Sequence, residues 1–133
     1  MDDHFRQLLE VAASQPRPHR LLFVFAAAEL PDEATEEQRA RFQAGLGGAL
    51  APLMCVDKAP EELSGFAELA EESRQAGPPW QVVFAAALPG RDGRPPGKAE
   101  IDGALQAMID AIRIGGVGRF AAYDAEGQPL QFA

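Results

Sequence analysis

The sequence predicts a single α/β domain over residues 1–133, with a mixed or mainly parallel sheet of four or five strands and about four helices. Two observations carry this prediction. Short apolar segments that suit buried strands alternate along the chain with amphipathic segments that suit helices. Proline and glycine stand between most of these segments, where they end helices and begin turns. A chain of this length has room for one hydrophobic core.

The first part of the chain begins with a predicted helix over residues 3–14, whose apolar residues recur at helical spacing. The run "QPRP" ends that helix, because proline disfavours helical geometry at the preceding residue. Residues 20–30 are apolar and rich in Phe, Val and Leu, which favours a buried strand. A loop and a helix are expected over residues 31–45, where Thr35 and Gln38 match a capping box.

The middle of the chain holds two further predicted strands. "ALAPLMCVD" at residues 49–57 predicts a strand that begins effectively after Pro52, and its apolar residues on both sides favour a central position in the sheet. A helix is expected from Pro60, because proline suits a first helical turn. "WQVVFAAAL" at residues 80–88 predicts the next strand.

The last part of the chain begins with "PGRDGRPPGK" at residues 89–98, which predicts a loop. The clearest amphipathic helix follows, because apolar residues recur there at helical spacing: Ile101, Leu105, Met108, Ile109 and Ile112. "GGVG" at residues 115–118 would end that helix. "RFAAYD" and "PLQF" then predict a C-terminal hairpin with Gly127 at its turn.

Two segments of similar sequence occur, one in each half of the chain. "FVFAAAELP" at residues 23–31 and "VVFAAALPG" at residues 82–90 share an apolar strand, three alanines and an exit through Leu-Pro. The chain can therefore be written as a helix–strand–helix–strand unit that occurs twice. Two copies are too few for a solenoid. The alternative is that two Ala-rich strands ending in proline arose by chance.

The net charge and the small numbers of cysteine and histidine residues argue against several classes of function. The net charge is −8, with 20 acidic and 12 basic residues, which argues against binding to a nucleic acid backbone. One cysteine excludes an internal disulfide, and with only two histidines we expect no protein-built metal site and no cofactor. The acidic N-terminus differs from a secretory signal, and the apolar runs are too short to span a bilayer. These features favour a cytoplasmic protein with no membrane partner.

A candidate ligand site lies around Asp57, at the carboxyl end of the second strand. In open α/β sheets with parallel strands, this edge is where ligands bind. The loop after the third strand brings Arg91, Arg94 and Lys98 to an otherwise acidic protein, and these cations suit an anionic ligand. Their spacing to the loop glycines does not match a P-loop. The alternatives are that Asp57 is a turn residue and that the loop is an exposed connection.

The single cysteine, Cys55, stands two residues before Asp57. A strand that is apolar on both sides favours a packed Cys55, because cysteine behaves there as a small hydrophobic residue. A reactive thiol would need a nearby cation, histidine or helix N-terminus to lower its pKa. Packing in the core is the expectation, and a thiol sensor is the alternative.

Three segments carry a resemblance: "RLLFVFAAAELP", "GALAPLMCVDKAPEEL" and "AGPPWQVVFAAAL". They resemble small proteobacterial proteins that are often labelled ribonucleotide reductase subunit alpha. That label implies a reductase with a redox cysteine pair and a radical-carrying cysteine in a large barrel. With 133 residues and one cysteine, the chain matches none of those catalytic residues, so the resemblance implies a small accessory protein.

No reaction motif stands out in the sequence, so an enzyme is not the leading expectation. We expect a small non-enzymatic cytoplasmic domain that works through protein contact, as a homo-oligomer or an accessory module. The alternative is a metabolite-binding domain or enzyme that holds an anionic ligand with Asp57 and the basic residues of loop 89–98.

Overall fold

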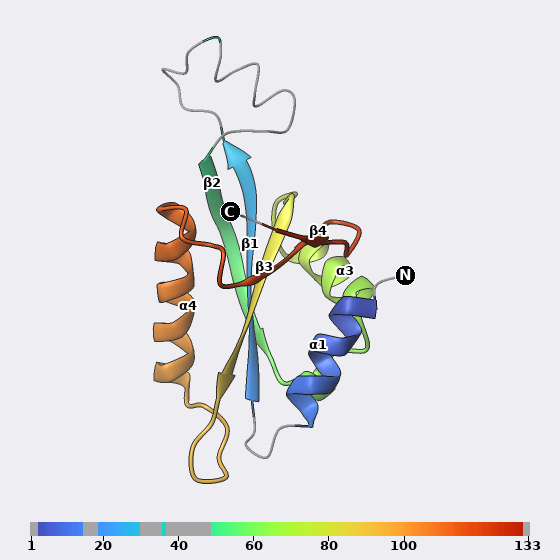
Figure 1. The fold of residues 1–133 in the computed structure, drawn as a ribbon, viewed down its shortest axis with the longest axis vertical. Helices are drawn as coiled ribbons and strands as arrows, with labels where there is room; N and C mark the ends of the chain where they lie inside the picture. The colour runs from blue at the N-terminus through green and yellow to red at the C-terminus, as the bar shows by residue number, and fades with distance from the viewer. Residues whose placement is uncertain (1–2, 15–18, 30–35, 37–48, 132–133) are drawn as a thin grey trace.

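The computed structural model describes residues 3–14, 19–29, 36 and 49–131. Within these residues the helices are α1 (Asp3–Ala13), α3 (Phe66–Ala76) and α4 (Lys98–Arg113), with a short 3₁₀ helix η1 (Pro60–Glu62). The strands are β1 (His19–Glu29), β2 (Ala49–Lys58), β3 (Val82–Pro89), β4 (Ala121–Asp124) and β5 (Pro129–Leu130). They form one sheet in the order β2-β1-β3-β4-β5, with α1 and α3 on one side and α4 on the other (Figure 1).

The predicted mixed or mainly parallel sheet is wrong, because every neighbouring pair of strands is antiparallel. Alternation of helix and strand indicates a parallel sheet only when each helix connects two parallel neighbours. Here α3 connects β2 to β3, which run in the same direction but lie on either side of β1. The helix therefore crosses over a strand that the local pattern could not place between them.

The predicted number of about four helices is also wrong, because the described residues hold three α-helices. The helix expected over residues 31–45 lies outside the described residues, apart from Glu36. The helix expected from Pro60 begins only at Phe66. Before it, the Glu62 carboxylate accepts a hydrogen bond from the Ala59 amide at 2.7 Å, and this contact closes the short turn η1.

The sheet separates two hydrophobic clusters, because alternate residues of β1 point to opposite faces. Leu21, Phe23 and Phe25 face α1 and α3, whereas Leu22, Val24 and Ala26 face α4. All six side chains are buried. The apolar segment that predicts a buried strand therefore forms one of the central strands of the sheet.

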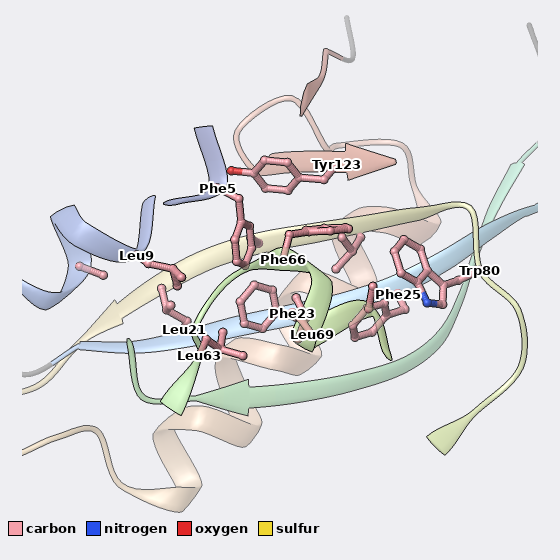
Figure 2. Packing of buried hydrophobic residues seen from close by; sticks show 14 residues of the cluster. Phe5, Leu9, Leu21, Phe23, Phe25, Leu63, Phe66, Leu69, Trp80 and Tyr123 are labelled. Atoms are coloured by element: carbon pink, nitrogen blue, oxygen red, sulfur yellow. The ribbon is translucent and has the colours of Figure 1, made fainter. Parts of the chain in front are cut away.

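Aromatic rings fill the cluster beneath α1 and α3 (Figure 2). The ring of Phe5 on α1 lies 5.3 Å from that of Phe66 on α3 and 5.4 Å from that of Tyr123 on β4, both in edge-to-face geometry. Buried Trp80 donates a hydrogen bond from Nε1 to Oγ of Ser73 at 2.7 Å, so its polar atom is satisfied. These contacts join both helices to the sheet.

The strand β2 lies at the edge of the sheet, so its predicted central position is wrong. Helices cover parts of both faces of β2, which explains why residues on both sides of the strand are apolar. Its side chains are nevertheless only half-buried over residues 50–54. The register with β1 shifts between Phe25 and Ala26, where Pro52 enters the pairing, as expected for a bulge near a proline.

The C-terminal hairpin predicted from the sequence is present as β4 and β5, which pair antiparallel. Gly127 adopts a φ of 86° in their connection, a conformation that suits glycine. The two segments of similar sequence, residues 23–31 and 82–90, lie largely within β1 and β3, which are neighbours in the sheet with Val24 opposite Phe84. None of the helices in the described part of the chain is long and apolar enough to cross a membrane.

Candidate functional site

Asp57 lies at the end of β2, where it takes part in an ion-pair cluster. Its Oδ2 accepts a hydrogen bond from Nε of Arg20 at 2.6 Å, and Nη1 of Arg20 lies 3.2 Å from Oε1 of Glu62. The side chains of Arg20 and Asp57 are 28% and 32% exposed. A nearby cation therefore already balances the charge of Asp57. The residues around Asp57 in the sequence do not indicate this partner, because the pairing of β1 with β2 brings Arg20 there.

The predicted loop after β3 contains a tight turn. The amide of Arg91 donates to the carbonyl of Arg94 at 3.0 Å, and the amide of Arg94 donates to the carbonyl of Arg91 at 2.9 Å. Between them Asp92 and Gly93 have φ values of 54° and 73°, as the two central residues of a type I′ turn require. The Asp-Gly pair is the sequence signal for this turn. Both arginine side chains remain exposed at its ends.

The basic residues of this loop lie at the same end of the sheet as Asp57, because β2 and β3 both end beside the start of β1. Within the described residues, Arg91 and Lys98 pair with carboxylates other than Asp57. Lys98 Nζ instead lies 2.9 Å from Oδ2 of Asp102, and this hydrogen bond raises the pKa of Lys98. Arg91 Nε lies 3.9 Å from Oε2 of Glu100. An anionic ligand would compete with these carboxylates, and the anion site stays a prediction.

Cys55 is exposed, so the expectation that it packs in the core is wrong. The reason is the edge position of β2, because among the described strands only β1 lies beside it. Partial burial of the thiol raises its pKa, and the negative charges of Asp102 and Asp57 raise it further. A reactive thiol needs the opposite shift. Exposure therefore does not make Cys55 a good nucleophile.

Replacing Asp102 with asparagine is expected to speed the labelling of native Cys55 by a thiol reagent by roughly twofold at neutral pH. The raised pKa keeps most of the thiol protonated, and removing one negative charge lowers that pKa and increases the thiolate fraction. The effect is modest because burial, the largest cause, remains. The measurement is the labelling rate as a function of pH. Asp110→Asn, also on α4, is the control, and equal rates for Asp102→Asn and the wild type would contradict the assignment.

The outer edge of β2 is a candidate interaction surface. Of the residues that the structure describes, none pairs with this side of the ten-residue strand. Residues 49–56 carry no charge. At the end of the strand, Nζ of Lys58 lies 2.5 Å from Oε1 of Glu72 on α3, so its charge is already paired. An edge of this kind presents backbone N–H and C=O groups to another strand.

A hollow of about 800 Å³ lies where the start of α3 meets α1 and the β4–β5 turn. Its charged lining residues have both signs: Arg6, Glu68, Glu71, Arg74 and Glu126. One arginine of the set pairs with a glutamate of the same helix at 3.5 Å. This lining favours neither an anion nor a cation.

Among the described residues, no group of three or more His, Cys, Asp or Glu side chains is placed to hold a metal ion. Comparison with protein-family models, with curated proteins and with solved structures finds no match.

Proposed function

We propose that this protein is a non-enzymatic, cytoplasmic interaction module that self-associates through the outer edge of β2. The observation that supports this proposal is the ten-residue edge strand β2, whose residues 49–56 carry no charge and whose outer side pairs with no other described strand. Strand addition is a common mode of recognition, in which main-chain hydrogen bonds supply affinity. An accessory role of this kind also agrees with what the sequence resemblance implies.

A second copy of the chain suits this edge for a symmetry reason. Two identical strands pair antiparallel about a two-fold axis, so that the same surface serves both partners. Natural proteins protect exposed edges with charges, prolines or bulges. In the part of the chain that the structure describes, the protection of β2 comes from Pro52, the adjacent bulge and the charges of Asp57 and Lys58 at its end. Leu53, Met54 and Val56 leave a half-buried apolar surface. Pairing would cover that surface.

The wild-type protein is expected to be a dimer by size-exclusion chromatography with light scattering, and Cys55→Lys is expected to shift it to the monomer. The substituted residue is exposed, so the fold tolerates it, whereas two lysines near the centre of a paired edge would repel each other. Ala107→Lys, on the exposed face of α4, adds the same charge elsewhere and should remain dimeric. A monomeric wild type, or a dimeric Cys55→Lys variant, would contradict the proposal.

A short bifunctional maleimide gives a second readout of the same proposal. Cys55 is the only cysteine of the chain, and it lies near the middle of β2. Antiparallel self-pairing brings the two copies of this thiol close together, so the reagent should trap a covalent dimer in dilute solution. Dimers that resist trapping would place the interface elsewhere on the molecule.

A further inference from the structure

A smaller and more apolar pocket, about 330 Å³ in volume, lies between α1 and the sheet. It is separate from the edge of β2. One helix, the start of β1 and the end of β3 supply its lining: His4, Gln7, Leu8, Val11, Ala12, His19, Leu21 and Ala87. Both histidines of the chain are in this set. Its volume lies at the lower end of the range for small-molecule sites.

The pocket exists because α1 carries two adjacent apolar stripes. Phe5 and Leu9 face the hydrophobic core, while Leu8 and Val11 lie on the neighbouring stripe and line the pocket. Val11 is 59% exposed, a high value for a large apolar residue.

The sheet also leaves space at this position. The strand β4 pairs only with residues 82–85 of β3, so the last part of β3 has no described neighbour on that side. Ala87 lies two residues beyond this paired stretch and contributes a methyl group where a larger side chain would fill the pocket. The short β4 and the small Ala87 together keep the pocket open.

The polar groups of the lining favour a hydrogen-bond acceptor. His4, His19 and Gln7 carry N–H groups, and no carboxylate is among the lining residues. Nδ1 of His4 lies 2.7 Å from the hydroxyl of Tyr123, which orients the imidazole ring. Figure 2 shows this hydroxyl pointing toward α1. The remaining surface is apolar, so the ligand needs an apolar body as well as an acceptor group.

We propose that this pocket binds a small carboxylic acid with an aromatic or branched apolar body. The carboxylate would accept hydrogen bonds from His4, His19 or Gln7, and the apolar body would contact Leu8, Val11 and Leu21. A cavity of about 150 Å³ accommodates benzene. The volume of this pocket is roughly twice that value, which leaves room for one ring and a carboxylate side chain.

The test is a titration of the ¹⁵N-labelled full chain with millimolar phenylacetate, followed by amide chemical shifts. The expected shifts are confined to residues 4–12, 19–21 and 86–88. Benzylamine and benzyl alcohol, which share the ring but lack the carboxylate, should bind at least about tenfold more weakly. Equal shifts with all three compounds, or no shift with phenylacetate, would overturn the proposal.

Two variants and one control variant examine the pocket itself. Ala87→Trp places a large ring in the pocket from an exposed position and should weaken phenylacetate binding by about tenfold or more. Ala107→Trp, on the exposed face of α4, is the matched control and should bind as the wild type does. His4→Phe keeps a ring but removes the donor, and it should reduce the preference for phenylacetate over benzyl alcohol. Undiminished binding by Ala87→Trp, with its spectrum still folded, would refute the site.

Discussion

Replacing Phe5 with alanine is expected to lower the free energy of unfolding by about 3–5 kcal/mol. The Phe5 side chain is fully buried, and its ring contacts those of Phe23, Phe66 and Tyr123. These partners come from β1, α3 and β4, so one ring joins α1 to three other elements. The loss is large because no neighbouring side chain on α1 can fill the space that the ring leaves.

Urea unfolding followed by circular dichroism measures this loss as a lower transition midpoint with an unchanged slope. Val11→Ala is the matched control on the same helix, because its side chain is largely exposed, and we expect it to change the free energy of unfolding by less than about 0.5 kcal/mol. A loss below about 1 kcal/mol for Phe5→Ala would mean that α1 does not depend on this contact for its position.

Replacing Phe84 with alanine is expected to lower the free energy of unfolding by about 3–5 kcal/mol as well, through the opposite face of the sheet. Phe84 on β3 is fully buried in the cluster beneath α4, and its ring lies 6.4 Å from that of Phe120. The other members of this cluster are mostly aliphatic, so a large share of the buried volume depends on this ring.

Ile114→Ala is the control for this second substitution, because Ile114 follows α4 and is 85% exposed. Its effect should stay within about 0.5 kcal/mol of zero. The sheet separates Phe84 from Phe5, so the milder pair Phe5→Leu and Phe84→Leu should be additive to within about 0.5 kcal/mol. Strong coupling between them would argue against two independent clusters.

Local sequence patterns predict the helices and strands of this fold but not the direction in which the strands pair. Apolar periodicity identifies the helices around Phe5 and Met108, and the apolar run that contains Val24 identifies a buried strand. Periodicity is a local property, so it can be read without knowing the partners of a segment. Strand direction is different, because it depends on which distant segment supplies the hydrogen bonds. The parallel sheet was therefore predicted wrongly.

The sequence predicts where the candidate site residues lie, but not all of their charged partners. Asp57 and Lys98 were expected at one end of the sheet, and both lie there, but their partners Arg20 and Asp102 decide what charge remains available. Lys98 and Asp102 are four residues apart on one helix, so their contact can be predicted from the sequence. Arg20 lies on β1 and Asp57 on the neighbouring strand β2, so their contact depends on how these strands pair. The histidine-lined pocket has no sequence signal, because it depends on how far the pairing of β4 extends along β3.

The sequence by itself determined the positions of most helices and strands, the acidic character of the protein and the lack of a recognisable reaction motif, since these follow from residue type and local spacing. Only the tertiary structure decided that the sheet is antiparallel, that β2 is an edge strand and that Cys55 is exposed. The physical reason is that burial and pairing depend on contacts between residues far apart in the chain. A strand with apolar residues on both faces looks the same in sequence whether one of its edges is paired or both are.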